Sequence, residues 1–256
     1  MKVKTKIRNL LFLSLTMISI FMIFTASANA ALTTIGTATY GEEEYNLIWD
    51  DDNNGNSVVW LDYTNEKADW SIQAAWAAGL DEELTINLYA GYAVTWDDDT
   101  WRLPTTVDDG QARVKGYEGD PDGDGIYTYT AGYNLANSEL GHLFYVELSN
   151  LGKYDTSEVK REVYGLLNTD DFENLVADYY FSGTAFTYQD GRFWVFDMDA
   201  GYQWTRSDGI DCYAMALRSG QVSAVPIPGA VLLLGSGFLG LMGVRRKRKN
   251  IRITYN

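Results

Sequence analysis

The chain has 256 residues, with 35 acidic residues, 20 basic residues and a formal net charge of −15. An aromatic content of 14% with eight tryptophans excludes an acidic disordered chain, because such chains lack the large apolar side chains that form a core. The single cysteine excludes an intramolecular disulfide, and the single histidine leaves too few ligands for a zinc site.

The N-terminus has the pattern of a removable signal peptide. Four basic residues lie among the first eight, an apolar run follows from 10 to 24, and Ala28-Asn29-Ala30 is a small-x-small cleavage site. The apolar run is shorter than the roughly 20 residues that a membrane-spanning helix needs, and a polar, Thr-rich segment follows it. We therefore expect cleavage after Ala30, with 1–30 as the signal peptide, and export of the remainder.

The exported segment is strongly acidic. All 35 acidic residues but only 10 of the 20 basic residues lie in 31–224, which gives this segment a formal charge of −25. Such a surface repels nucleic acid and anionic glycans and attracts divalent cations. We expect no nucleic-acid partner, and a segment of this length fits one domain with a substantial core.

The first half of this domain is predicted to contain a hairpin, a helix and two further strands. The runs 45–49 and 57–63 flank the Asn/Gly-rich connection 50–55, which indicates a hairpin. Asn65 is expected to cap a helix that ends at Gly79, because Trp70, Ala74, Ala75 and Ala78 recur at helical spacing. Strands are expected at 84–89 and 92–96.

The second half is predicted to contain one helix and then a series of strands. The helix spans 138–150, with Asn137 as its cap, Gly152 as its stop, and Leu140, Phe144, Leu148 and Leu151 facing inward. The expected strands are 179–183, 193–198, 202–206 and 213–218. In the strand 193–198, either the face of Trp194 or that of its aromatic neighbours must be core. The expected fold class is a mixed α+β domain with short antiparallel strands and about two helices.

The two residues best suited to nucleophilic catalysis, Cys212 and His142, show no sequence context that indicates a catalytic role. Cys212 lies in an alternating, strand-like run and is interpreted as a small buried apolar residue. A nucleophile pair between Cys212 and His142 lacks supporting context. The sequence contains no Gly-x-Ser-x-Gly, His-Glu-x-x-His or P-loop motif, so we expect no enzyme. A glycosidase built from Asp and Glu alone stays open as an alternative.

Two acidic segments have the spacing of half a calcium loop. Asp120, Asp122 and Asp124 with Gly125 supply acids at positions 1, 3 and 5 and glycine at position 6, and 50–55 repeats this spacing. Neither segment has the acidic residue at position 12. A solvated turn is favoured for 50–55, where the hairpin explains the Asn-Gly pair. For 120–125, a solvated turn and a Ca²⁺ site are both open, and Ca²⁺ is the one cofactor that the sequence suggests.

Five motifs in order resemble the Lcl C-terminal-like domains, a family named after a bacterial collagen-like adhesin. The motifs cover most of 40–222, and the fold that the resemblance implies is similar to the C-type lectin and formylglycine-generating-enzyme group. The calcium-dependent sugar signatures Glu-Pro-Asn and Trp-Asn-Asp are absent. The resemblance implies an adhesin-like interaction domain at 31–222. The motifs are Trp101-Arg102-Leu103-Pro104-Thr105, 138–144, 180–184, 193–197 with Gly201-Tyr202, and Ala216-Leu217-Arg218.

The two arginines of these motifs, Arg102 and Arg218, could serve either a structural role or a ligand-binding role. Pro104 fixes its own φ and favours an extended Leu103, so the Trp101–Thr105 motif is the pinned start of a loop. Arg218 ends an apolar strand and is expected to pair with a carboxylate or to bind loop carbonyls. For Arg102 and Arg218 we favour the structural reading, because isolated arginines beside apolar runs usually satisfy local acceptors.

The C-terminal segment 223–256 resembles a sorting signal of the exosortase type, the PEP-CTERM class. An apolar stretch of about 20 residues, sufficient to span a bilayer as a helix over roughly 225–244, precedes five consecutive cations, which are expected to stay on the cytoplasmic side. A plain single-span anchor is the alternative. The sorting motif is Val225-Pro226-Ile227-Pro228-Gly229, which has Ile227 in place of the usual glutamate, and the cations are Arg245, Arg246, Lys247, Arg248 and Lys249.

Together these features predict an exported protein of the cell envelope, cell surface or extracellular matrix. Its expected partners are an exosortase-like processing enzyme, the membrane through the C-terminal helix before processing, and glycans or matrix polymers. The leading function is adhesin-like carbohydrate or protein binding. The alternatives are a secreted glycosidase based on carboxylates and a purely structural matrix component.

Overall fold

The computed structural model describes residues 32–107, 114–119 and 129–225. Within these ranges the domain is mostly β-sheet with two short helical segments, which agrees with the expected α+β class. The elements in chain order are β1 (Thr33–Tyr40), β2 (Glu43–Asn53), β3 (Asn56–Ala68), α2 (Trp70–Glu83), β4 (Thr85–Leu88), β5 (Tyr92–Trp96), β6 (Val114–Gly119), β7 (Tyr129–Tyr133), α3 (Glu139–His142), η1 (Leu143–Glu147), β8 (Tyr179–Ala185), β9 (Arg192–Asp197), β10 (Tyr202–Ser207) and β11 (Cys212–Ala224).

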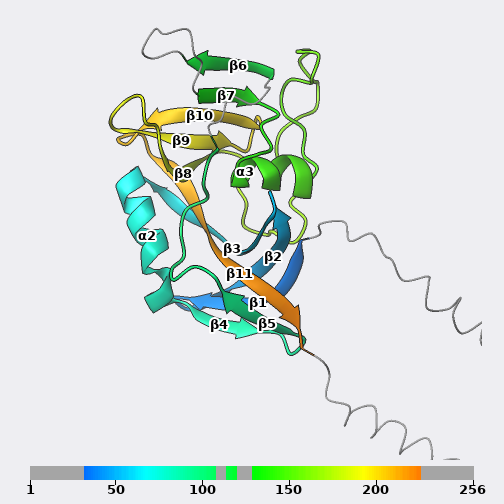
Figure 1. The fold of residues 1–256 in the computed structure, drawn as a ribbon, viewed down its shortest axis with the longest axis vertical. Helices are drawn as coiled ribbons and strands as arrows, with labels where there is room; N and C mark the ends of the chain where they lie inside the picture. Colours follow the sequence, from blue (N-terminus) through cyan, green and yellow to red (C-terminus); the bar gives the residue numbers. More distant parts are fainter. Residues whose placement is uncertain (1–31, 108–113, 120–128, 226–256) are drawn as a thin grey trace, which may run out of the picture. The chain divides into compact units, whose positions relative to one another are not determined.

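The long last strand joins two groups of strands (Figure 1). The strand order is β4-β1-β2-β3-β11-β8-β9-β10-β7-β6, and β5 pairs with the far end of β11. β11 is antiparallel to β3 and to β5, and it is parallel to β8 through Tyr213 and Tyr180. The chain therefore returns at its end to hold the N-terminal strands and β8–β10 in one sheet.

The central strands are buried on both faces. On β2, β3, β9 and β11, neighbouring residues belong to different core clusters; Ile48, Trp60, Phe196 and Leu217 lie with Leu140 and Phe144 of the α3–η1 segment. Leu47, Leu61, Val195 and Ala216 lie in the cluster that contains Ala77 and Leu80 of α2. Because successive side chains of a strand point to opposite faces, α2 and the α3–η1 segment cover opposite faces of the sheet.

This double burial corrects the expectation for strand 193–198. Trp194 and Val195 are both fully buried, Phe196 is 2% exposed, and Phe193 stacks on Trp70 of α2 with ring centroids 3.7 Å apart. The sequence suggested that one face of this strand could meet solvent. The structure buries both because helices from distant parts of the chain pack on each side.

The predicted hairpin is confirmed, with longer strands. Asn53 pairs with Asn56 across a two-residue turn in which Asn54 has φ 54° and Gly55 has φ 83°. Asparagine and glycine tolerate this left-handed backbone, and the turn matches the twist of the flanking strands. The turn is shorter than the expected connection 50–55, so Asp50 belongs to β2.

The first predicted helix begins later than expected. Asn65 lies in β3, where it pairs with Ala214 of β11, and its side-chain amide donates to Gln73 Oε1 at 2.7 Å. Pairing with β11 thus extends the strand through the expected cap. The helix starts at Trp70 after Asp69 and continues past Gly79 to Glu83, and it buries Gln73, Ala77 and Leu80.

The second predicted helix is shorter and irregular. It starts after Ser138 rather than Asn137 and passes from an α-turn into a π-helical turn that ends at Glu147. The expected inward residues Leu140, Phe144 and Leu148 are buried, but Leu151 is 42% exposed. Ser149, with φ 52°, turns the chain away before Gly152.

The strands predicted at 84–89, 92–96, 179–183, 193–198 and 202–206 are confirmed with bounds that shift by at most two residues, whereas the strand predicted at 213–218 is much longer, Cys212–Ala224. β1, β6 and β7 are not expected from the sequence. β11 runs through Ala224, the residue before Val225. In the described ranges the structure contains no helix with the length and apolar character needed to cross a membrane. The signal peptide, Asp120–Asp124 and the sorting segment from Pro226 onward lie outside the described residues.

Candidate functional site

The Trp101–Thr105 motif forms a pinned, extended loop. Trp101 is 1% exposed and Leu103 is 3% exposed. The backbone N–H of Arg102 donates to Leu217 O, and the N–H of Leu217 donates to Arg102 O, both at 3.0 Å. The backbone N–H of Gly183 in β8 donates to Pro104 O at 2.8 Å. The motif therefore connects the centre of β11 to β8.

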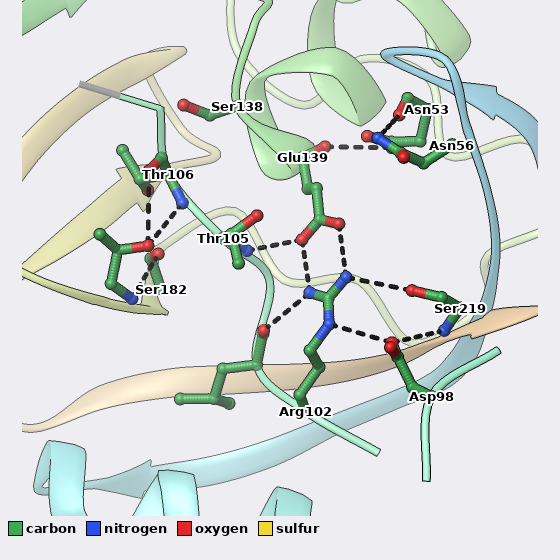
Figure 2. A network of polar contacts seen from close by, with 12 residues as sticks. Asn53, Asn56, Asp98, Arg102, Thr105, Thr106, Ser138, Glu139, Ser182 and Ser219 are labelled. Atoms are coloured by element: carbon green, nitrogen blue, oxygen red, sulfur yellow. Dashed lines mark hydrogen bonds and ion pairs between the residues drawn. The ribbon is translucent and has the colours of Figure 1, made fainter. Parts of the chain in front are cut away.

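Arg102 forms a two-pronged ion pair with Glu139 at the start of α3 (Figure 2). Its Nη1 lies 2.7 Å from Glu139 Oε2, and its Nη2 lies 2.8 Å from Glu139 Oε1. The same carboxylate accepts the backbone N–H of Thr105 at 2.6 Å. Burial would lower the pKa of Arg102, but the hydrogen bonds and charge of Glu139 outweigh it and raise that pKa.

The remaining donors of Arg102 are also occupied. Nε donates to Asp98 Oδ2 at 3.5 Å, Nη1 to Leu103 O at 3.3 Å and Nη2 to Ser219 Oγ at 3.4 Å. A guanidinium has five N–H donors, and these contacts give each of them an acceptor. Arg102 therefore has a structural role in this conformation, and its side chain has no donor left for a ligand.

Arg218 makes both kinds of contact expected from its sequence position. Nη1 lies 2.6 Å from Asp81 Oδ1, while Nε and Nη2 donate to the backbone carbonyl of Asp98 at 3.0 and 2.9 Å. The guanidinium also lies 4.8 Å from the ring centre of Trp96. Arg218 thus ties the loop after β5 to the end of α2.

The acidic connection 50–55 is a solvated turn only in part. Asp52 is exposed, and its carboxylate accepts the backbone N–H of Gly55 at 2.9 Å. Asp50, in contrast, is fully buried. Among the residues that the structure describes, no group of three or more His, Cys, Asp or Glu side chains is arranged to hold a metal ion.

Asp50 belongs to a buried polar cluster under the hairpin. Its Oδ2 accepts the side-chain amide of Asn53 at 2.8 Å and the indole N–H of Trp60 at 3.2 Å. Burial raises the pKa of Asp50 to about 6, and these two hydrogen bonds offset the shift only in part. His142 lies nearby, with its ring nitrogens 3.1 Å from Asn54 Oδ1 and 3.1 Å from Glu147 Oε1.

The environment of His142 favours its protonated form. Burial would lower the pKa of His142, but the hydrogen bond to Glu147 and the charge of Asp50 raise it overall. A histidine whose folded-state pKa is raised stabilises the fold at low pH and loses this effect as the pH rises through that pKa. A buried carboxyl with a raised pKa acts in the same direction, because its ionisation in the folded state is costly.

We expect Asp50 and His142 to contribute more to the free energy of unfolding at pH 4.5 than at pH 7.5. The unfolded chain ionises Asp50 near pH 3.8 and the folded chain near pH 6, so the unfolding free energy falls as the pH rises between them. The loss is at most about 3 kcal/mol. Urea unfolding at both pH values should show that Asp50→Asn flattens the pH dependence, whereas the exposed control Asp190→Asn does not. An unchanged profile in Asp50→Asn would contradict this assignment.

Cys212 is the buried strand residue that the sequence indicated. It is 0% exposed, its thiol lies 3.7 Å from Ile210 O, and burial raises its pKa to about 11. A thiol with this pKa stays protonated near neutral pH and is a poor nucleophile. The ring nitrogens of His142 contact Asn54 and Glu147 instead of this thiol.

A pocket of about 450 Å³ on the C-terminal strands was not foreseen from the sequence. We call it the β10 pocket. Its lining combines aromatic rings, arginines and hydroxyl groups, and no described lining residue is Asp or Glu. The lining residues are Tyr179, Arg192, Tyr202, Trp204, Thr205, Arg206, Ser207 and Ile210.

The rings of the β10 pocket are held by strand pairing. Tyr202, Trp204 and Arg206 alternate along β10 and therefore share one face of the sheet. The rings of Tyr202 and Trp204 are 5.7 Å apart between centroids and inclined by only 20°. The guanidinium of Arg206 lies 3.6 Å from the ring centre of Tyr179, which comes from β8.

The neighbourhood of these rings extends the aromatic surface. Tyr133 of β7 lies 4.7 Å from Tyr202 and 5.1 Å from Tyr154 between ring centroids. Burial and the charge of Tyr179 raise the pKa of Tyr202, so its hydroxyl stays protonated and able to donate a hydrogen bond. The surface therefore offers ring faces, hydroxyls and two cations in an otherwise acidic domain.

Such a lining is suited to an extended polar ligand with apolar faces. Ring faces pack against the C–H surfaces of a sugar, and arginine and hydroxyl groups donate to its oxygens. One signal of this surface was present in the sequence, the alternation of Tyr202, Trp204 and Arg206. Tyr179 joins them only through the pairing of β8, β9 and β10. Arg192 pairs with Ser207, and its Nε and Nη2 donate to Thr205 Oγ1 at 3.0 Å and Thr205 O at 2.7 Å.

No family model matches this chain, and no curated protein or solved structure matches it either. The function is therefore inferred from the geometry of the described residues.

Proposed function

We propose that this protein is an exported interaction protein of the cell envelope or extracellular matrix that binds a glycan through the β10 pocket. The observation that carries the proposal is the joining of near-parallel Tyr202 and Trp204 rings with Arg206 in one open pocket of about 450 Å³. Aromatic side chains with adjacent hydrogen-bond donors are a common way to orient a polar ligand.

The proposal includes the origin and processing of the chain. Residues 1–30 act as the signal peptide, and 223–256 act as a sorting segment that an exosortase-like enzyme processes. The end of β11 lies two residues beyond this boundary, because Ser223 and Ala224 still pair with β5, and the motif residues Val225 and Pro226 follow directly. The finer fold assignment, an Lcl-like domain of the C-type-lectin-like group, belongs to the same proposal.

The proposed sugar contact is independent of calcium. The described β10 pocket has no carboxylate in its lining to hold a cation, and the guanidinium of Arg206 supplies donors directly. This lining also suits binding better than hydrolysis, because glycosidases place two carboxyl groups at the scissile bond. A sugar without acidic groups is favoured, since the exported segment as a whole is strongly acidic.

A glycan array with the exported protein, run with and without EDTA, tests the function. We expect binding to a defined set of glycans that EDTA does not abolish. Release of shortened glycans would instead indicate a glycosidase, and cation-dependent self-association without any glycan hit would indicate a structural matrix component.

Point variants then test the site. Tyr202→Ala should raise the dissociation constant for the glycan about tenfold. This change corresponds to roughly 1.4 kcal/mol, the contribution of one stacked ring. Tyr89→Ala is the matched control, because Tyr89 is 49% exposed and lies on a different strand connection. Equal binding by Tyr202→Ala and Tyr89→Ala, with unchanged melting temperatures, would remove the β10 pocket as the site.

A further inference from the structure

A second aromatic pocket lies at the end of the N-terminal strands. Its volume is about 750 Å³, and we call it the Tyr63 pocket. Its lining residues come from β1, β2 and β3, from the turn between β1 and β2, and from the last residue of α2. The lining residues are Tyr40, Gly41, Glu42, Glu43, Tyr45, Tyr63 and Glu83.

Three tyrosine rings meet in this pocket at steep angles. Tyr63 lies between the other two, 5.1 Å from Tyr40 at 63° and 4.8 Å from Tyr45 at 70°. Trp76 of α2 lies behind Tyr63, with ring centroids 5.9 Å apart. At these separations the rings are in edge-to-face contact with one another, so they form one continuous aromatic wall of the pocket rather than a cage with space between the rings.

The charge of the pocket has one sign. Three of its seven lining residues are glutamates, and none of its described lining residues is basic. The hydroxyl of Tyr45 donates a hydrogen bond to the carboxylate of Glu43 at 2.9 Å. Glu43 itself is exposed to solvent. Burial, together with Glu43, raises the pKa of Tyr45 to about 12, so this ring carries a neutral hydroxyl.

The end of α2 adds to the negative potential. The last turn of the helix contains Asp81, Glu82 and Glu83 and no basic residue. The C-terminal end of a helix carries partial negative charge and is stabilised by cations, so acidic residues there are unfavourable. Arg218 neutralises Asp81 at 2.6 Å, but Glu83 faces the Tyr63 pocket. This unbalanced charge favours a cation in the pocket.

We propose that the Tyr63 pocket binds an organic cation of the quaternary-ammonium class. The trimethylammonium group lies against the aromatic wall that Tyr40, Tyr45 and Tyr63 form, and Glu43 and Glu83 supply the countercharge. Aromatic rings attract such cations through their negative faces, and the methyl groups make dehydration easier than for a primary ammonium. A metal ion is a poorer fit, because in the described part of the chain no three acidic, histidine or cysteine side chains, these glutamates included, are grouped closely enough to hold one ion.

Choline and its uncharged isostere 3,3-dimethylbutan-1-ol provide the test, by isothermal titration of the exported protein at low salt. We expect choline to bind at least tenfold more tightly than the isostere, and salt to weaken choline binding. A peptide with a trimethylated lysine distinguishes the source of the group, a small molecule or a modified protein. Equal affinities for choline and the isostere, or no binding of either, would overturn the proposal.

Point variants separate the contribution of the tyrosine rings to choline binding from that of the glutamate charges. Tyr63→Leu and the double variant Glu43→Gln with Glu83→Gln should each weaken choline binding about tenfold or more. The matched controls are Tyr89→Leu and Glu162→Gln, which change an exposed tyrosine and an exposed acid outside this pocket. If the double glutamine variant binds choline as the wild type does, the glutamates do not supply the countercharge and the proposal fails. If Ca²⁺ at matched ionic strength displaces choline fully, the site is only an acidic surface and the proposal fails as well.

This inference is independent of the glycan proposal. The Tyr63 pocket and the β10 pocket share no lining residue. Loss of choline binding with glycan binding intact, or the reverse, therefore assigns a failure to one pocket alone.

Discussion

Trp194→Ala and Phe196→Ala are each expected to lower the free energy of unfolding by about 3 to 5 kcal/mol, because both remove a large ring from a packed interior. Trp194 is fully buried and packs against Phe186, with ring centroids 5.5 Å apart. Phe196 packs against Phe144 of the α3–η1 segment at 5.4 Å. Urea unfolding followed by tryptophan fluorescence and circular dichroism measures both changes.

The control for these core variants is Tyr89→Ala, which should change the unfolding free energy by less than about 0.5 kcal/mol as an exposed substitution. Val195→Ala on the opposite face of β9 should also be destabilising, because Val195 is 0% exposed. A strand with one solvent-facing side would tolerate one of these changes. Unchanged melting temperatures in both Trp194→Ala and Phe196→Ala would contradict the position of β9 in the sheet.

Glu139→Gln is expected to lower the free energy of unfolding by about 2 to 4 kcal/mol, because it removes the bidentate carboxylate from Arg102 in a largely buried site and leaves only the longer ion-pair contact with Asp98 at 3.5 Å. The carboxylate of Glu139 holds three groups at once, two guanidinium nitrogens and the backbone N–H of Thr105. Its loss therefore loosens the link between the Trp101–Thr105 loop and α3.

A surface ion pair provides the matched control. Lys67 and Asp178 lie 2.6 Å apart with side chains 40% and 32% exposed, and Lys67→Ala should cost less than about 1 kcal/mol. The double variant Arg102→Met with Glu139→Leu should recover part of the stability lost in Glu139→Gln, since it removes the buried charge together with its partner. Equal decreases in the free energy of unfolding for Glu139→Gln and Lys67→Ala would show that the buried ion pair contributes no more to stability than the surface pair.

These two predictions concern the scaffold that both pockets depend on. β9 lies between β8 and β10, so its burial sets the relative positions of Tyr179 and Tyr202. Arg102 and Arg218 hold the loop 97–105 against β11 and the end of α2, where Glu83 enters the Tyr63 pocket. A variant that weakens the scaffold should therefore reduce both binding activities, whereas a pocket variant should reduce one.

The elements that the sequence predicted well are those with local causes. The hairpin turn at Asn54 and Gly55 needs a left-handed backbone, and these two residue types are the ones that adopt it readily. The strand Tyr92–Trp96 was placed with its observed bounds, because a short alternating run stands between a glycine and a run of aspartates. In both cases the signal lies within a few residues of the feature.

The errors have causes elsewhere in the chain. Asn65 has the chemistry of a helix cap, but pairing with Ala214 on β11 keeps it in a strand. Leu151 has the spacing of an inward helical residue, but the chain turns at Ser149 and leaves it exposed. β1 was missed because its partners β2 and β4 supply the pairing that its own pattern only weakly indicates. Local preference is small compared with tertiary packing and is overridden by it.

The sequence by itself determined the acidic charge, the hairpin, the burial of Cys212 and the structural contacts expected of Arg218. Only the tertiary structure decided that Glu139 is the partner of Arg102, that β9 is buried on both faces, and that Tyr40, Tyr45 and Tyr63 meet Glu83. Turn and strand preferences act between neighbours in the chain and can be read from a short window. Pockets and buried ion pairs join residues tens of positions apart, and their positions follow from the order and register of strands that no local pattern specifies.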